Sequence, residues 1–343
     1  MRIIDIQPRS ILSSAGNETV EVNLKAGNGK SSTASIPAGI STGRFEIKNL
    51  PVNEAILQIN NFKNDLLNRE FSQESLDKLL VEFDFAGNVA LPISVAFWKL
   101  QPLQKKNFPK LFLLLFEGGK HGNPNIGMQE FALLEETITE ATVDFKRLSE
   151  YLKKQGLATT VGAEGAFSPE NFDDIKVLDT LKEIFPHKKI AIDAANTFSK
   201  SEPDYETLLK NYNIVSLEDP FSEEAWSKWE AFYQKFGKQI MIVGDDLTVT
   251  NGKRLTMALN PPVINAIIIK PNQNGTISGA LEVVRLAKEK GLKIIISHRG
   301  EETDDTWIVD FAVSVGADFV KFGGMDRGER IAKYNRLREL GMN

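Results

Sequence analysis

The amino-acid sequence predicts an α/β protein in which a (β/α)8, or TIM-type, barrel follows an N-terminal α+β capping domain. Between residues 188 and 323, six short apolar runs rich in Ile and Val each lead to a polar residue that could carry chemistry. These polar residues recur every 23 to 28 residues, and helix-like stretches lie between the runs. Strands that alternate with helices at this spacing indicate right-handed βα units and a parallel sheet.

The six runs are typical of strands buried on both faces of a sheet. Their polar residues are Asp193, Glu218 and Asp219, Asp245 and Asp246, Lys270, His298 and Arg299, and Lys321. A solenoid would give a similar period. The constant position of the polar residue at the carboxyl end of the strand favours a barrel, because barrel enzymes build their active sites at that end.

Two upstream runs, residues 110–116 and 128–134, complete the eight strands. The connection between them is too short for a helical crossover, so we expect an antiparallel pair and an irregular ββαα start to the barrel. The Gly-rich stretch 157–167 is interpreted as a loop. Stretches that end at glycine predict helices over 222–237, 277–291 and 303–316.

The pattern is different before about residue 105. Residues 18–37 alternate between polar and apolar types and are interrupted by Gly27-Asn28-Gly29, which predicts a hairpin. Helical stretches follow at 52–68, 74–82 and 88–100. We therefore predict an N-terminal α+β capping domain over residues 1–105 and a catalytic barrel over residues 106–343.

Composition narrows the possible functions. The chain has 343 residues, a net charge of −5 and no cysteine. The absence of cysteine excludes disulfides, thiolate nucleophiles and cysteine-bound metals. The acidic balance argues against nucleic acid as the main partner. The N-terminus does not resemble a signal peptide, and no apolar run is as long as a membrane helix, so we expect a cytoplasmic protein that does not enter a membrane.

The strand ends suggest a metal site. If the barrel closes, Asp193, Glu218 and Asp245 lie at one rim on three successive strands. Carboxylates this close repel one another, so either some are protonated or a cation lies among them. Ligation by oxygen alone suits Mg2+, Mn2+ or Ca2+ better than zinc. The alternative is that these acids are exposed and pair with lysines of the helices.

Lys270 stands in register with these acids. Burial and a neighbouring divalent cation would both disfavour its ammonium form, so it could act as a general base near neutral pH. Metal ions and a lysine base suit removal of a proton α to a carboxylate, because the cations stabilise the resulting ene-diolate. The alternative is a lysine that only pairs with the acids.

The sequence resembles the enolase family along nearly its whole length. The motifs that carry this resemblance are GNETVEV (16–22), PAGISTG (37–43), AGNVALPISVAF (86–97), GGKHGN (118–123), MQEF (128–131), VGAEGAF (161–167), SLEDPF (216–221), VGDDLTVTN (243–251), IIKPNQNGT (268–276), SHRGEETDDT (297–306) and DRGERIAKYN (326–335). Each motif alone is weak, but their order along the chain makes the resemblance specific.

The resemblance implies reversible dehydration of 2-phosphoglycerate to phosphoenolpyruvate, in glycolysis and gluconeogenesis. By motif position, Lys270 would remove the C2 proton and Glu164 would protonate the departing hydroxyl. Two Mg2+ ions are implied, the first held by Asp193, Glu218 and Asp245 and the second near Ser41. The residues implied on the substrate side are His121, Gln129, Glu130, His298, Arg299, Gly300 and Lys321. Arg299 would bind the phosphate, and the family is usually dimeric, sometimes octameric.

Three positions depart from the family pattern. Ala15 stands where the family usually has arginine, Ala163 where it has aspartate, and Gly300 where it has a serine that contacts phosphate. The chain is also shorter than is typical, in the N-terminal domain and between Asp193 and Glu218. Trimmed loops could alter lid closure, subunit contacts or substrate choice.

Other functions remain open at this point. One is a related lyase acting on another hydroxy acid, and another is an enolase-like protein that mainly binds a partner, such as plasminogen or an RNA-degrading assembly. The G-x-S-x-G pattern at residues 39–43 also matches a hydrolase elbow. A hydrolase is disfavoured because the pattern precedes the barrel and no helix is expected directly after it.

Overall fold

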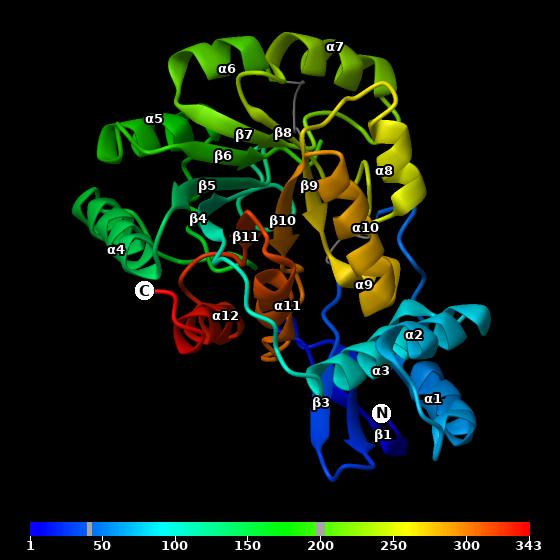
Figure 1. Ribbon diagram of the computed structural model, residues 1–343. Coiled ribbons are helices and arrows are strands. Elements are labelled where there is room, and N and C mark those ends of the chain that lie inside the picture. Colours follow the sequence, from blue (N-terminus) through cyan, green and yellow to red (C-terminus); the bar gives the residue numbers. More distant parts are fainter. Residues whose placement is uncertain (40–42, 197–202) are drawn as a thin grey trace.

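The apolar runs of the sequence close into a barrel in the computed structural model, which describes residues 1–39, 43–196 and 203–343. The strands follow one another in the order β10-β11-β4-β5-β6-β7-β8-β9, and β9 pairs with β10. The predicted eight-stranded barrel is therefore confirmed, and Figure 1 shows it above the N-terminal elements. Its strands are β4 (Lys110–Glu117), β5 (Glu130–Glu135), β6 (Ile190–Asp193), β7 (Ile214–Glu218), β8 (Met241–Gly244), β9 (Ala266–Ile269), β10 (Lys293–Ser297) and β11 (Phe319–Lys321).

One strand runs against the others. β5 is antiparallel to both β4 and β6, and the remaining neighbours pair in parallel, so the expected irregular start is confirmed. As a result Glu130, the first residue of β5, pairs with Glu117 at the end of β4 and with Asp193 at the end of β6. We call this end of the barrel, where the parallel strands finish, the mouth.

Alternate residues of the strands pack into two separate cores, as strand geometry requires. In β9, Ala266 and Ile268 belong to a small apolar cluster inside the barrel. Ile267 and Ile269 belong to the larger core between the strands and the surrounding helices. Burial on both faces explains why these strands appear in the sequence as continuous apolar runs, each fully buried Ile contributing about 1.5–3 kcal/mol.

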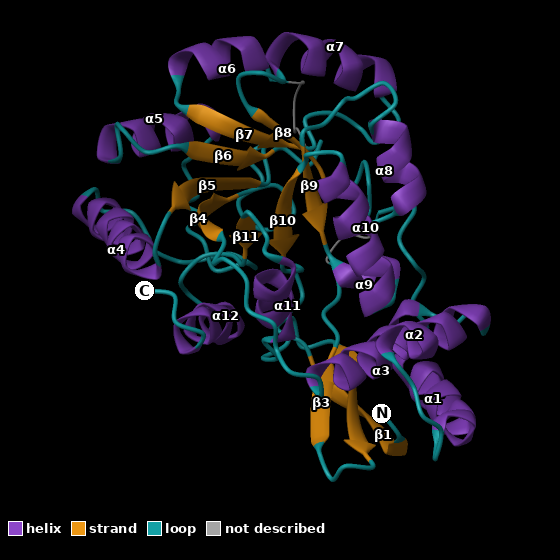
Figure 2. Cartoon of the chain, viewed as in Figure 1, coloured by secondary structure: helices purple, strands orange, loops and turns teal. Residues whose placement is uncertain are grey.

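Helices surround the barrel and connect its strands (Figure 2). They are α4 (Ile138–Lys154), α5 (Asp174–Ile184), α6 (Tyr205–Asn211), α7 (Trp226–Phe236), α8 (Gly252–Ala258), α9 (Pro271–Asn274), α10 (Ile277–Glu289), α11 (Trp307–Val315) and α12 (Gly328–Glu339). None of the helices in the described ranges has the length and hydrophobicity needed to cross a lipid bilayer.

Two helices begin later than the sequence predicts, because tertiary contacts hold the residues before them. α7 begins at Trp226 rather than near residue 222, since Arg254 binds the Glu223 carbonyl at 2.8 Å and the Glu224 carboxylate at 3.0 Å. α11 begins at Trp307 rather than near residue 303, since Asp305 forms a 2.9 Å ion pair with Lys99.

The N-terminal region packs helices against a three-stranded sheet. The strands are β1 (Ile3–Leu12), β2 (Glu18–Ala26) and β3 (Ser31–Ser35), and the helices are α1 (Val52–Leu66), α2 (Gln73–Glu82) and α3 (Gly87–Lys99). The predicted hairpin and all three helices are present. β1 was not predicted, because Pro8 interrupts its pattern; proline is tolerated there because β1 is an edge strand.

This region also touches the barrel mouth. Ala38 and Glu301 exchange backbone hydrogen bonds of 2.8 and 3.0 Å, and the Ser35 hydroxyl bonds Thr303 at 2.7 Å. These contacts bring the segment after β3 over the ends of the barrel strands.

Candidate active site

A cavity of about 300 Å³ opens at the mouth of the barrel. Most of the residues that the sequence predicted for the site line it, namely His121, Gln129, Glu130, Glu164, Asp193, Asp245, Lys270, His298, Arg299, Gly300 and Lys321. Glu218 lies just behind this lining, in contact with Lys321. Ser41 falls outside the described residues. The structure therefore brings together side chains from seven of the barrel strands or their ends, β5 to β11, and from two loops.

A buried ammonium group lies among three carboxylates on one wall of the cavity. Lys321 Nζ is 3.0 Å from Glu130 Oε2, 3.0 Å from Asp193 Oδ2 and 2.9 Å from Glu218 Oε1. We call these four residues the mouth cluster. Burial opposes the charge on Lys321, but its carboxylate neighbours outweigh burial and hold its pKa well above the usual value.

The acids of the mouth cluster carry more negative charge than Lys321 neutralises. Burial, followed by repulsion from Asp193, raises the pKa of Glu218 well above its ordinary value. Burial also raises the pKa of Glu130 to about 8, although Lys321 acts against this. An additional cation would stabilise the ionised form of buried carboxylates whose pKa values are raised in this way.

A second acidic group lies beside the first. Asp219, Asp245 and Asp246 place one carboxylate oxygen each within 4.8 Å of the others. Asp219 accepts hydrogen bonds from the backbone N–H groups of Asp245, at 3.0 Å, and Asp246, at 2.6 Å. Burial and repulsion from Asp245 raise the pKa of Asp246 to about 7.

Lys270 follows β9 and forms an ion pair with Asp245. The sequence led us to expect that burial would disfavour its ammonium form. Burial does act in that direction, but the Asp245 carboxylate outweighs it, and the pKa of Lys270 is raised rather than lowered in the protein alone. Lys270 could therefore accept a proton only when Asp245 is engaged elsewhere.

Glu164 lies on another side of the cavity between two histidines. Its carboxylate oxygens are 3.4 Å from His121 Nδ1 and 3.3 Å from His298 Nε2. Burial alone would raise the pKa of Glu164, but the two histidines lower it well below its usual value. Glu164 is therefore ionised in the protein alone.

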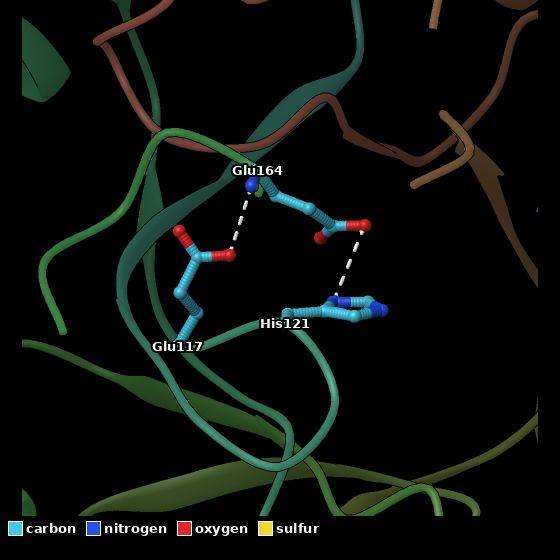
Figure 3. Close-up of side chains that lie close together, drawn as sticks. All are labelled: Glu117, His121 and Glu164. Atoms are coloured by element: carbon cyan, nitrogen blue, oxygen red, sulfur yellow. Dashed lines mark hydrogen bonds and ion pairs between the residues drawn. The ribbon is translucent and has the colours of Figure 1, made fainter. Parts of the chain in front are cut away.

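The two histidines differ in protonation. Burial opposes the charge on His121, but Glu164 outweighs it, and the pKa of His121 rises to about 9. Burial lowers the pKa of His298 to about 4, and Arg330, which contacts its Nδ1, adds to this effect. At neutral pH His121 thus carries a proton, whereas His298 is neutral. Figure 3 shows His121 Nδ1 facing the Glu164 carboxylate.

Arg299 is engaged by an acid that the sequence did not indicate. Its guanidinium binds both carboxylate oxygens of Glu46 at 3.0–3.1 Å and the Asn272 side chain at 3.0 Å. Glu46 belongs to the segment after β3, and its carboxylate also accepts the Gly43 backbone N–H at 2.9 Å. A substrate anion that binds Arg299 must share it with Glu46.

The residues at the mouth are suited to a divalent cation. Glu218, Asp219 and Asp246 are acids whose pKa values are raised by burial and by neighbouring carboxylates such as Asp193 and Asp245, and their oxygen donors are the type that Mg2+ and Ca2+ prefer. Among the described residues at the mouth, Asp219, Asp245 and Asp246 bring their oxygens close enough to share such an ion, whereas Asp193 and Glu218 are bound to Lys321 in the protein alone.

Sequence reasoning missed three residues that shape the site. Glu117 ends the apolar run of β4, the same pattern that singled out Asp193 and Glu218, and could have been found from it. Glu46 and Arg330 gave no comparable signal, because neither follows an apolar strand. Fully buried Arg330 comes from α12 and donates to the backbone carbonyls of Arg299, at 2.8 Å, and Gly300, at 2.7 Å.

Two positions that depart from the family pattern serve the site through their backbone. Ala163 donates its N–H to the His121 carbonyl at 3.0 Å, and the Gly300 carbonyl accepts Arg330. Neither provides a polar side chain to the cavity. Ala15 lies in the turn after β1, away from the cavity lining.

Two protein-family models match the chain. The model described as enolase, N-terminal domain, matches residues 3–107. The model described as enolase, C-terminal TIM barrel domain, matches residues 186–341.

Proposed function

Because this chain belongs to the enolase family, we propose that it is a Mg2+-dependent lyase that reversibly dehydrates 2-phosphoglycerate to phosphoenolpyruvate. The observation that carries the proposal is the convergence of Lys270, Glu164 and the acidic groups on one cavity. Lys270 follows β9, whereas the loop of Glu164 pairs with β4, and β10 and β11 separate these two strands on one side of the barrel. A base and an acid can therefore reach one substrate from different directions.

Lys270 is the proposed base for the proton on C2, the carbon next to the substrate carboxylate. Such a proton is very weakly acidic, so the base must be positioned closely and must be neutral before it acts. The ion pair with Asp245 keeps Lys270 protonated, and release of Asp245 from this pair lowers its proton affinity. In this proposal, the engagement of Asp245 in ligand binding activates Lys270.

Glu164 is the proposed acid for the departing hydroxyl group. It is ionised in the protein alone, so it must first gain a proton. The proposed donor is His121 Nδ1, 3.4 Å from a Glu164 oxygen, because His121 is protonated at neutral pH whereas His298, at 3.3 Å, is neutral. Transfer of that proton leaves a neutral imidazole and a carboxylic acid, and the acid then protonates the hydroxyl, which leaves as water.

Asp193, Glu218 and Asp245 are the proposed ligands of a first Mg2+. When bound, the ion would stabilise the negative charge that forms on the substrate carboxylate as the C2 proton is removed, by several kcal/mol. A second Mg2+ near Ser41 is part of the proposal. The raised pKa values of Glu218 and Asp246 support a need for added positive charge at this place.

The remaining residues are proposed to bind and orient the substrate. Arg299 would bind the phosphate after displacing or sharing Glu46, with His121 and Gln129 nearby, and Lys321 would face the substrate carboxylate. His298 and Glu130 would support Glu164, and Gly300 would contribute only its backbone.

The test is turnover of 2-phosphoglycerate by the full chain with Mg2+, followed by the absorbance of the enol phosphate. We expect turnover that is abolished by EDTA and restored by Mg2+. If 2-phosphoglycerate is not turned over while an acid sugar or another hydroxy acid is, the substrate assignment is wrong and the family chemistry stands.

One observation favours that second candidate, a related dehydratase. Arg299 is already bound by Glu46, and Gly300 lacks the hydroxyl that contacts phosphate in the family, so the phosphate site is weaker than expected. A substrate without phosphate would need neither group. Parallel assays with phosphorylated and non-phosphorylated hydroxy acids separate the two candidates.

The cellular setting is part of the same proposal. We propose a role in glycolysis and gluconeogenesis in the cytoplasm, and a homo-oligomeric state, as a dimer or an octamer. Light scattering of the purified full chain would measure that state directly.

A further inference from the structure

Glu117 is a buried acid that the proposed mechanism does not use. It is the last residue of β4 and is fully buried. It is not among the described residues that line the cavity, so it does not touch a substrate there. It nevertheless belongs to one group with His121 and Glu164, which Figure 3 shows in close-up.

Both carboxylate oxygens of Glu117 bind the backbone of the loop that carries Glu164. Oε2 accepts the N–H of Glu164 at 2.9 Å, and Oε1 accepts the N–H of Ala166 at 3.0 Å. A Cβ atom at Gly162 would lie 2.6 Å from Glu117 Cδ, so the loop can approach this closely only with glycine there. Hydrogen bonds from backbone N–H groups to an ionised carboxylate are stronger than those to neutral acceptors.

The backbone of Glu117 binds the same loop. Its N–H donates to the Phe167 carbonyl at 3.1 Å, and its carbonyl accepts the Ser168 hydroxyl at 2.9 Å. The His121 carbonyl in turn accepts the N–H of Ala163 at 3.0 Å. The 162–168 loop is thus held on both sides of Glu164 by β4 and by the turn that carries His121.

We propose that Glu117 is a positioning residue, whose carboxylate clamps the Glu164 loop so that Glu164 meets His121 within proton-transfer reach. The catalytic meaning of this clamp rests on the acid role proposed above for Glu164, whereas the clamp itself does not. A bound cation would be an alternative use of the Glu117, His121 and Glu164 group. It is disfavoured, because both Glu117 oxygens are already directed at N–H groups.

The charge of Glu117 adds to this positioning. The charged or titratable groups that face His121 are Glu164, Glu130 and Glu117, and those that face Glu117 are Glu164 and His121. Those that face Glu164 are His121, His298, Glu117 and Glu130. Burial, followed by repulsion from Glu164, raises the pKa of Glu117 to about 7. Once ionised, Glu117 favours the protonated form of His121.

The test compares Glu117→Gln with a matched control, Glu135→Gln. Glu135 is also a buried acid on the neighbouring strand with a pKa near 7, but it lies at the far end of the barrel. NMR of the full chain with labelled histidine and Mg2+ present follows His121. We expect E117Q to lower the pKa of His121 by about half a unit or more and to shift the Glu164 and Ala166 amide protons. E135Q should change neither.

This NMR measurement does not require turnover, so it tests whether Glu117 holds the Glu164 loop even if the proposed reaction is wrong. Unchanged His121 titration and unchanged amide protons in folded E117Q would overturn the proposal. If E117Q does not fold, the wild-type protein serves instead. Its Glu164 and Ala166 amide protons should then shift together with the Glu117 carboxyl carbon as pH passes through 7, and a carboxyl titration that leaves both amides unmoved would refute the clamp.

Kinetics test the catalytic part separately. In Glu117→Ala, kcat for 2-phosphoglycerate should fall roughly tenfold to a hundredfold with KM within about twofold of wild type, because the acid is misplaced while the cavity lining is intact. Replacement of Glu135 should leave both constants within about twofold. A rise in KM with unchanged kcat would contradict a positioning role for Glu117.

Discussion

The barrel holds a lysine among buried carboxylates at each of its ends. At the mouth, Lys321 contacts Glu130, Asp193 and Glu218. At the opposite end, Lys188 contacts Glu135 and Asp144, and we call these three residues the bottom cluster. The lysine of the mouth cluster is 4% exposed, whereas that of the bottom cluster is 32% exposed.

The surroundings of the two clusters explain why only one is a candidate active site. The mouth cluster borders a cavity and adjoins three more acids, Asp219, Asp245 and Asp246, so negative charge exceeds what its lysine can balance. The bottom cluster has two acids, and solvent reaches its lysine. The ion pairs of the bottom cluster are therefore structural. Those of the mouth cluster leave an excess of negative charge that a bound cation can balance.

The largest expected effect lies at the mouth. Lys270→Ala should lower kcat by about two to four orders of magnitude, as expected when a general base is removed. Steady-state turnover of 2-phosphoglycerate with Mg2+ measures this, and circular dichroism checks that the variant is folded. Activity close to wild type would remove Lys270 from the role of base.

Substitutions in the bottom cluster should lower the free energy of unfolding without changing the turnover rate. Lys188→Met leaves Glu135 and Asp144 unpaired, which should lower the free energy of unfolding by about 2–3 kcal/mol, below the full value for a buried pair because Lys188 is partly exposed. Urea unfolding measures this loss. Below the melting temperature the variant should turn over substrate at a wild-type rate, and a large loss of rate would show that the two ends are not independent.

The pH dependence of stability should follow Glu135. Burial raises its pKa from 4.5 to about 7, although Lys188 opposes this. A carboxyl whose pKa is raised on folding stabilises the protein fully below pH 4.5 and loses that contribution as pH rises through 7. The free energy of unfolding of Glu135→Gln, relative to that of wild type, should therefore increase as pH rises from 5 to 8, by at most about 3 kcal/mol. Denaturant curves at several pH values test this, and a difference that stays constant with pH would contradict it.

The smallest effect concerns Glu46 at the mouth. Glu46→Gln removes the charge that competes for Arg299, so KM for a phosphorylated substrate should fall by roughly threefold to tenfold. KM for a substrate without phosphate should change little, which makes such a substrate the internal control. An increased KM for the phosphorylated substrate would indicate instead that Glu46 helps to form the phosphate site.

Much of the fold follows from local sequence pattern. The runs that end at Asp193, Glu218 and Ile269 are strands because burial on both faces needs continuous apolar residues, and that need is visible in the sequence. The starts of α7 and α11 were placed too early, because long-range contacts from Arg254 and Lys99 decide them. β1 was missed because Pro8 is tolerated only at a sheet edge, and the edge is known only once the sheet is formed.

The residues of the candidate site likewise fall into those that a local sequence pattern predicts and those that only long-range contacts place there. Residues that finish a parallel strand, such as Asp193, could be predicted from their position in the pattern. Lys270 was also found in this way, but the direction of its pKa shift was not, since it depends on the distance to Asp245. Glu46 and Arg330 reach the mouth from distant segments, and a local pattern contains no information about such contacts.

The reversed direction of β5 gives the mouth one further property. The connection between β4 and β5 is the short segment from residue 118 to residue 129, and it carries Lys120 and His121 into the cavity lining. A crossover helix does not intervene, so this turn joins two strand ends directly above the cavity. A change in its length would move no helix, yet it would shift His121 relative to Glu164, so the shape of the entrance and the placement of Glu164 are tied to the same short turn.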